Sequence, residues 1–228
     1  VKVSQHNVIR MPDDLPFLDA AATQVAYATA WELVVNKAHV RQGEDVLINA
    51  AGSGVGSAAI QVARLAGARI IATAGSDEKL ERARQLGADE VINYNKTEDI
   101  AAAVMEMTGG RGVDVAYDSV GRISAEESLN SLRPAGWFVT YGNASGPVEP
   151  IPPGRLAQGG SLVMTRPTLF HFIPDADSLA RGASLLFSAL KSGTIHADIG
   201  QRFPLSEAAK AHEAIESGTT TGATVLVP

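Results

Sequence analysis

Short apolar runs alternate with alanine-rich segments from residue 45 onward in this 228-residue chain, and this alternation limits the fold more than any other feature. The runs are rich in β-branched residues and apolar on both faces, which is typical of parallel strands covered by helices on each side. Repeated strand and helix units connect through right-handed crossovers. We therefore expect an α/β fold with a doubly wound parallel sheet. The predicted strands are DVLINA (45–50), ARIIATA (68–74), DEVINY (89–94), VDVAYDSV (113–120), GWFVTYG (136–142) and SLVMTR (161–166).

Helices are predicted between these strands because apolar residues recur there at helical spacing. Gly67, Gly87 and Gly109 stand near three of the predicted ends, where glycine in a left-handed conformation commonly terminates a helix. Another helix is predicted before the first strand, and Pro16 marks its start. The predicted helices cover residues 18–38, 54–66, 77–86, 98–107 and 124–132. The expected apolar face of the first helix consists of Ala22, Val25, Ala26, Thr29, Ala30, Leu33 and Val34.

The chain after the sixth strand has a different pattern. Residues 146–160 are rich in Pro and Gly and predict a loop. A helix is predicted at 176–192, and the segment from Phe203 to Pro228 predicts one more helix and a final strand. Because this tail follows the sixth strand and a long helix, we expect it to belong to another layer than the sheet.

Composition excludes several classes of function. The 19 Lys and Arg against 25 Asp and Glu give a net charge of −6, and the basic residues are scattered, so no nucleic-acid partner is expected. The sequence has no Cys, which excludes disulfides, thiolate nucleophiles and Cys-based zinc sites within it. Its five His are isolated and lack metal-ligand spacing, so no metal site is predicted.

The uncharged stretch from Val46 to Ala63 approaches the length of a membrane span. Gly52, Gly54 and Gly56 interrupt it, which favours a buried strand, a turn and a helix. The amino end lacks the charged region and apolar region of a secretory signal. We therefore expect a soluble cytoplasmic protein without a membrane partner. The opening residues resemble the middle of a longer protein, so we also expect an upstream part.

The segment NAAGSGVG (49–56) joins the first predicted strand to an alanine-rich helix. A dinucleotide pyrophosphate needs backbone N–H groups at a helix N-terminus, without Cβ atoms in the way. The strict G-x-G-x-x-G pattern is not met, because Ala51 and Ser53 stand where the first two glycines would. A plain tight turn is the alternative, but the strand before and the helix after favour a dinucleotide-binding Rossmann fold.

The end of the second strand bears on which nicotinamide cofactor binds. An acid there would hold the ribose 2′-hydroxyl of NAD, but the strand ends at Thr73-Ala74. Ser76 then opens a helix whose Lys79 and Arg82 suit an anionic phosphate. Ser76 as a simple N-cap and Lys79 as a solvated surface residue form the alternative. Asp77 and Glu78 lie near the spacing of the NAD acid, yet they also suit the helix dipole. We predict NADPH.

Five motifs stand in order along the chain: residues 48–94, from INAAGSGVG to EVINY, then VDVAYDSVG (113–121), WFVTYGNASGPV (137–148), VMTRPTL (163–169) and TTTGATVLVP (219–228). In this order they resemble the zinc-independent, zeta-crystallin-like quinone oxidoreductases of the medium-chain dehydrogenase/reductase superfamily. The resemblance spans nearly the whole chain. It implies that residues 1–20 are the remnant of a GroES-like catalytic domain, that 21–193 form the Rossmann domain, and that 194–228 return to the truncated catalytic domain.

The resemblance also implies where each part of the cofactor lies. It assigns the pyrophosphate to Ala51, Gly52, Ser53, Gly54 and Val55, and the 2′-phosphate to Ser76, Lys79 and Tyr94. It assigns the ribose and the nicotinamide to Ser119, Val120 and Gly121, and the carboxamide to the backbone of Tyr141, Gly142 and Asn143. Thr29 is assigned to the nicotinamide ring.

Two departures from the family matter. Zinc-dependent relatives place a Cys ligand where this chain has Val25, which argues against a catalytic zinc. Relatives also often carry Arg just before the terminal TTG-type motif, whereas Gly218 and Thr219 stand here, so one phosphate contact is expected to be lost.

The resemblance implies an NADPH:quinone oxidoreductase that transfers hydride from nicotinamide C4 to a quinone or an α,β-unsaturated carbonyl compound. Two alternatives stay open: an enoyl-thioester reductase and a non-catalytic, crystallin-like NADPH-binding protein. The apolar segment Ser161 to Thr165 lies at a predicted sheet edge and, with the resemblance, predicts a homodimer. No residue here is assigned as a proton donor, so this chain alone is expected to bind NADPH but to turn over poorly.

Overall fold

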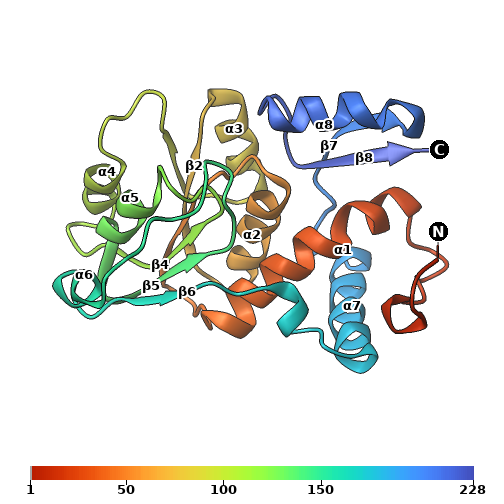
Figure 1. Ribbon diagram of the computed structural model, residues 1–228, viewed down its shortest axis with the longest axis horizontal. Coiled ribbons are helices and arrows are strands. Elements are labelled where there is room, and N and C mark those ends of the chain that lie inside the picture. The colour runs from red at the N-terminus through yellow and green to blue at the C-terminus, as the bar shows by residue number, and fades with distance from the viewer. Residues whose placement is uncertain (1) are drawn as a thin grey trace.

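A six-stranded parallel sheet forms the centre of the computed structural model (Figure 1). The structure describes residues 2–228. Residue 1, the first of the predicted 1–20 segment, lies outside the described residues. The strand order is β3-β2-β1-β4-β5-β6, the order of two Rossmann halves. All six predicted strands and the predicted fold class are confirmed. The strands are β1 (Asp45–Ile48), β2 (Arg69–Ala74), β3 (Glu90–Asn93), β4 (Val113–Asp118), β5 (Leu132–Thr140) and β6 (Val163–Thr165).

Helices cover both faces of this sheet, because the strand side chains alternate between two cores. Val46 and Ile48 pack in one core with side chains of the first three helices, while Leu47 packs in the other with side chains of the next three. The first group is α1 (Phe17–Trp31), α2 (Gly54–Leu65) and α3 (Asp77–Leu86). The second group is α4 (Ile100–Met107), α5 (Ala125–Asn130) and α6 (Pro153–Gln158).

The three predicted helix ends marked by glycine agree with the structure, whereas the helix predicted at 124–132 ends at Asn130 and Leu132 already belongs to β5. Gly67, Gly87 and Gly109 have φ values of +78°, +114° and +62°, in the left-handed region that a side chain disfavours. The uncharged stretch from Val46 to Ala63 folds as β1, a turn and most of α2. Within the part of the chain that the structure describes, no helix combines the length and the apolar content of a membrane span.

The first helix differs from its prediction in two ways. It changes at Trp31 into a π-helical segment, η2 (Glu32–Lys37), in which the Ala38 amide donates to the Leu33 carbonyl five residues earlier. Its predicted apolar face included Val25, which is 70% exposed, whereas Tyr27 is 1% exposed. Helical periodicity is compatible with burial of either residue. Tyr27 is the buried one, and its hydroxyl donates a hydrogen bond to the carbonyl of His196.

The predicted loop at 146–160 is wrong in part, because α6 lies inside it. Pro152 and Pro153 suggest a loop, but a proline in the first helical turn is compatible with a helix, since that amide needs no partner. Beyond the sheet, α7 (Ala176–Lys191) confirms the predicted helix, and an Asp175–Ser178 capping box fixes its start. The short elements η1 (Gln5–Asn7) and η3 (Leu169–His171) flank this region.

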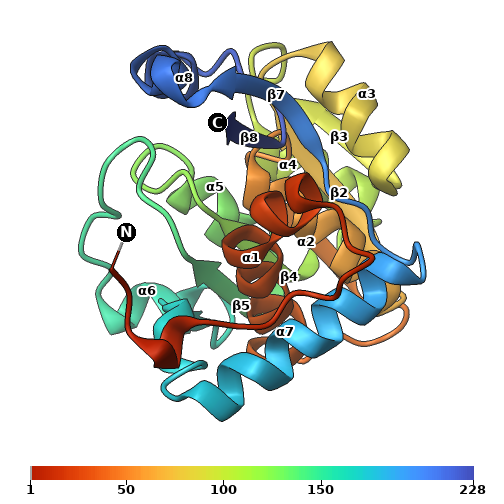
Figure 2. The same cartoon turned by 90° about the vertical axis from the view of Figure 1, so that its right-hand side faces the viewer.

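The last part of the chain forms its own small sheet, as its predicted separation from the main sheet implies. β7 (Ile199–Pro204), which the sequence did not predict, pairs in parallel with β8 (Ala223–Val227); η4 (Leu205–Glu207) and α8 (Ala208–Glu216) connect them. In Figure 2, α1 lies between α7 and this β7–α8–β8 unit. A single bridge, Ser53 to Gly222, links the unit to the turn after β1.

Candidate functional site

The turn between β1 and α2 is built around close backbone contacts. A Cβ atom at Gly56 would lie 2.3 Å from the Ala50 carbonyl oxygen, so only glycine fits there. Ala50 itself has a φ of +54°, a conformation that costs a non-glycine residue energy and that clusters at functional sites. Ser53 caps α2 by accepting a hydrogen bond from the Gly56 amide at 3.1 Å. The turn is therefore held tightly against the start of α2.

This turn fits a dinucleotide pyrophosphate. The first amides of a helix have no acceptor within the helix, which leaves that of Val55 available to an anion, whereas the parallel bridge between Ser53 and Gly222 engages the Gly54 amide. Gly52, Ser53, Gly54 and Val55 are all partly exposed. Ala51 is the exception among the predicted pyrophosphate residues, because it is buried and its amide donates to the Thr73 carbonyl.

Ser76, Lys79 and Tyr94 gather around the end of β2. The Tyr94 hydroxyl lies 2.6 Å from the position that a Cβ atom of Gly75 would occupy. Ser76 is the N-cap of α3, as the structural alternative predicted, and accepts a hydrogen bond from the Lys79 amide. The Lys79 side chain packs over Gly52, where a Cβ atom would lie 2.9 Å from Lys79 Cδ. The Lys79 ammonium donates to the Gly218 carbonyl at 2.6 Å. A cation therefore stands between the glycine turn and the end of β2.

Two other charges near this corner, Arg82 and Asp77, are already paired. Arg82, which the sequence also suggested for phosphate, instead binds the buried carboxylate of Asp198, with Nε at 2.7 Å. The pairing spans 116 residues, so spacing along the sequence could not reveal it. The exposed Asp77 accepts hydrogen bonds from Lys96 and Asn93, which hold its pKa below its usual range. The Asp77 carboxylate is thus directed toward the end of β3 and toward Lys96, in the turn after that strand.

The turns after β4 and β5 interlock at the same edge of the sheet. Gly142 approaches Ser119 so closely that a Cβ atom would lie 2.3 Å from the Ser119 carbonyl oxygen. The Ser145 amide donates to the Val120 carbonyl at 2.8 Å. This contact brings the predicted ribose and carboxamide stretches together, including the half-buried Tyr141 and the exposed Asn143. Burial raises the pKa of the Tyr141 hydroxyl to about 12, so it is a weak acid.

Arg166 and Asp118 take part in these turns, although the sequence did not single them out. Arg166, just after β6, donates to the Gly142 carbonyl at 2.8 Å and to the Thr140 hydroxyl at 3.1 Å. Asp118, the last residue of β4, accepts hydrogen bonds from the amides of Val120 and Gly121. Their positions at strand ends were a signal that could have found them, since parallel sheets bind ligands at that edge.

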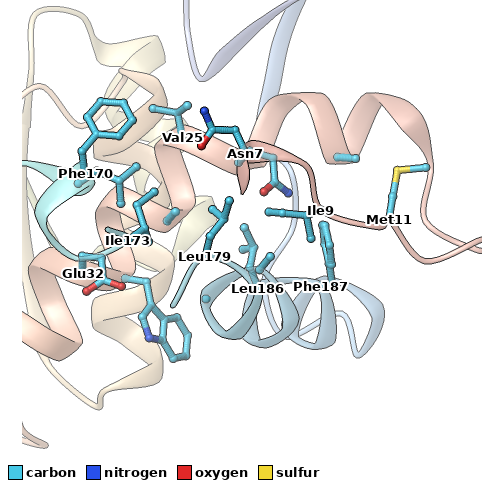
Figure 3. A pocket seen from close by; sticks show the side chains of 17 residues that line it. Asn7, Ile9, Met11, Val25, Glu32, Phe170, Ile173, Leu179, Leu186 and Phe187 are labelled. Atoms are coloured by element: carbon cyan, nitrogen blue, oxygen red, sulfur yellow. The ribbon is translucent and has the colours of Figure 1, made fainter. Parts of the chain in front are cut away.

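One cavity borders the site, and a second lies beside α1. The first, of about 440 Å³, lies between the ends of β1, β2, β3 and β4 and is lined by Asn49, Thr73, Tyr94, Val120 and Ser124 among others. The second, of about 350 Å³, lies between the N-terminal segment, α1, η3 and α7. Figure 3 shows Val25 and Phe170 on one side of this second cavity, opposite Ile9, Leu186 and Phe187.

Thr29 follows Val25 by one turn of α1 and is half-buried. The helix passes the glycine turn close by, since the Cβ atom of Ala26 lies 3.8 Å from the position of a Cβ on Gly54. Among the described residues, no group of three His, Cys, Asp or Glu side chains is arranged to hold a metal ion. Val25 contributes an aliphatic side chain beside the apolar cavity.

Comparison with known proteins gives a consistent result. Residues 54–173 match the family model described as zinc-binding dehydrogenase. A quinone oxidoreductase from Pseudomonas aeruginosa is 41% identical over 99% of this chain and 69% of its own length. A 2-haloacrylate reductase from a Burkholderia species is 41% identical over 97% of the chain and 67% of its own length. Both are thus similar to this chain over about two thirds of their own length.

The fold comparison agrees with the sequence comparison. The crystal structure of Escherichia coli quinone oxidoreductase complexed with NADPH superposes with a TM-score of 0.91 at 39% identity. That superposition covers 96% of this chain and 67% of the E. coli chain. The strand order, the glycine turn and these matches show that the chain belongs to the quinone oxidoreductase family of the medium-chain dehydrogenase/reductase superfamily.

Proposed function

We propose that this chain belongs to an NADPH-dependent, zinc-independent oxidoreductase that reduces a quinone or an α,β-unsaturated carbonyl compound. The observation that carries the proposal is the strand edge where the glycine turn, Lys79 and the interlocked turns after β4 and β5 meet, in a chain about 40% identical to quinone oxidoreductases. Val25, in place of a cysteine, supports zinc independence.

The residues of this edge have separate tasks in the proposed reaction. When bound, NADPH supplies a hydride from C4 of the nicotinamide, and the cofactor performs the redox chemistry. The Val55 amide holds the pyrophosphate, and Lys79 holds the 2′-phosphate together with Ser76 and Tyr94. The turns at Ser119 to Gly121 and at Tyr141 to Asn143 orient the ribose and the carboxamide.

The apolar cavity at Val25 and Phe170 supports the substrate class. Its walls are mostly aliphatic and aromatic, with Asn7, Gln24 and Glu32 as the polar exceptions, and such walls suit a flat ring better than a sugar or a phosphate. Hydride transfer to one carbonyl oxygen or β-carbon must be completed by a proton. Tyr141 is a weak acid and Thr29 a weaker one, so we assign no proton donor within this chain.

The test is an NADPH fluorescence titration alongside NADPH oxidation with a panel of quinones, enones and enoyl thioesters. We expect saturable NADPH binding and slow turnover, because proton transfer from a positioned side chain typically contributes about 10²–10⁴-fold to the rate. Oxidation restricted to enoyl thioesters would favour the thioester reductase. Rapid quinone turnover would mean that a proton donor within residues 2–228 has been overlooked.

Lys79→Ala is expected to weaken NADPH binding about tenfold or more and to leave NADH binding unchanged, because a charged hydrogen bond contributes on the order of 1.5–3 kcal/mol. The 2′-phosphate must compete with the Gly218 carbonyl for the same ammonium. Calorimetric titration with both cofactors measures the effect. Lys191, the last residue of α7, forms an ion pair with Asp14, and Lys191→Ala removes an equal charge and serves as the control. Equal losses for both cofactors would contradict the assignment.

We also propose a homodimer formed through β6. This strand lies at the sheet edge with β5 as its one neighbour in the sheet, and its residues are half-buried. Val163→Lys should convert a dimer into a monomer at micromolar concentration, since a charge on an edge strand opposes pairing. Light scattering gives the molar mass directly. A monomeric parent protein, or a dimer that tolerates lysine here, would refute this interface.

The division of the chain into residues 1–20, 21–193 and 194–228 stays a proposal. The separate β7–β8 sheet supports a boundary after α7, and α1, which begins at Phe17, supports one near residue 20. We also propose the cytoplasm as the location, where NADPH is the reductant at hand.

A further inference from the structure

Asp118 is the most buried carboxylate at the carboxyl edge of the sheet. It ends β4, is 0% exposed, and is bound entirely by neutral donors. A buried carboxylate is costly unless hydrogen bonds replace the water it has lost. Because this carboxylate is nevertheless buried, the groups that it binds indicate its role.

The two carboxylate oxygens bind different parts of the edge. Oδ1 accepts hydrogen bonds from the amides of Val120 and Gly121, both at 2.8 Å. Oδ2 accepts from Asn49 Nδ2 at 3.1 Å, Ser124 Oγ at 2.7 Å and Ser128 Oγ at 2.8 Å. One side chain thereby joins the turn after β4, the start of α5 and the end of β1.

Asn49 extends this network to β2. Its side-chain oxygen accepts a hydrogen bond from the Thr73 hydroxyl at 2.9 Å, while its amide nitrogen also donates to Ser128 at 2.8 Å. Asn49 directly precedes the glycine turn, and Val120 belongs to the stretch assigned to the ribose. Both residues, with Thr73, line the 440 Å³ cavity. The network therefore lies directly beneath the surfaces that would contact a dinucleotide.

We propose that Asp118 is a positioning residue of the cofactor site, which fixes the turn after β4 relative to the glycine turn through its bond to Asn49. This inference rests on the proposed function, because it concerns the same NADPH site. A carboxylate is required, since its two oxygens accept five donors. An asparagine at position 118 keeps one oxygen to accept from the amides of Val120 and Gly121. Its NH2 group, however, replaces the oxygen that accepts from the NH2 group of Asn49, so two donors face each other.

Asp118→Asn is therefore expected to weaken NADPH binding about tenfold or more, the usual cost of losing hydrogen bonds to a charged group. Asn49→Asp combined with Asp118→Asn exchanges the two groups and restores donor facing acceptor. This exchange should recover most of the affinity. A group needed only for stability would not show such a recovery of binding, so fluorescence titration of NADPH is the principal measurement.

Asp114→Asn is the matched control. Asp114 lies four residues earlier on β4, is also buried, and binds Arg111 and Arg133 at the opposite edge of the sheet. It should lower the melting temperature and leave the dissociation constant for NADPH unchanged. All titrations are made at a temperature where every variant is folded.

The outcomes separate the two proposals. If the parent protein does not bind NADPH, the proposed function fails. If it binds, and Asp118→Asn binds equally well with only a lower melting temperature, Asp118 is structural and the inference is wrong. Failure of the exchanged pair to recover affinity also overturns it. If Asp118→Asn does not fold, Ser124→Ala removes one donor and should still weaken binding about threefold; unchanged binding there overturns the inference.

Discussion

Gly56→Ala is expected to bind NADPH about tenfold more weakly or worse, because moving the turn loses a hydrogen bond to a charged group, which contributes on the order of 1.5–3 kcal/mol. The added methyl group would lie 2.3 Å from the Ala50 carbonyl oxygen and 2.9 Å from the Ala51 Cα atom. Both contacts are backbone, so the turn itself must move away from α2. Overpacking of this kind should also reduce the free energy of unfolding by about 3 kcal/mol.

Gly54→Ala is the control for packing in the same turn. Its methyl group would meet the Gly222 carbonyl oxygen at 3.6 Å and Ala26 Cβ at 3.8 Å, which are ordinary contacts. Thermal melting should therefore distinguish the two variants, with a loss of roughly 6–12 °C for Gly56→Ala and little change for Gly54→Ala. Equal melting temperatures would show that the turn is less rigid than its contacts indicate.

Asp114→Ala is expected to reduce the free energy of unfolding by about 2–4 kcal/mol. Asp114 is 4% exposed and accepts hydrogen bonds from Arg111, Arg133 and the Asp45 amide. Loss of one partner from a fully buried ion pair costs about 3–5 kcal/mol, but these arginines are partly exposed and can regain water. Lys210→Ala, at an exposed pair with Glu207, should change stability little.

The same group predicts a dependence on pH. Burial alone would raise the pKa of Asp114, but the hydrogen bonds from Arg111 and Arg133 outweigh it and hold the pKa below the usual 3.8. A depressed pKa stabilises the folded protein above the unfolded-state value, and this contribution disappears as the pH falls through the folded-state value. Urea unfolding between pH 3 and pH 6 should thus show a steeper acid loss in the parent protein than in Asp114→Ala. Parallel curves would contradict the assignment.

The fold could be predicted from the sequence because its determinants are local. Strand and helix periodicity, and glycines at helix ends such as Gly67 and Gly87, depend on neighbours within a few residues. The helix α6 escapes prediction because Pro152 and Pro153 are typical of a loop, although a helix tolerates proline in its first turn. β7 was missed because its pairing with β8 joins residues more than twenty positions apart.

The candidate site could be predicted only where a motif marks it. The glycine turn and Lys79 stand in recognisable patterns. The partners that fix them are far away in the sequence: Arg82 binds Asp198, Lys79 binds Gly218, and Asn49 binds Asp118. Arg82 was assigned to phosphate because its own helix suggested it, while its buried partner lay 116 residues away. Charge spacing within one helix does not reveal such a competitor.

The contact between the glycine turn and the β7–α8–β8 unit has a consequence for biosynthesis. The Gly222 amide donates to the Gly52 carbonyl at 2.8 Å, across 170 residues of chain. A ribosome makes the phosphate-binding turn early, but that turn lacks this support until residue 222 has emerged from the exit tunnel. The glycine turn therefore reaches its finished form only after residue 222 has been translated, so a nascent chain that ends before this residue is expected to hold NADPH less firmly.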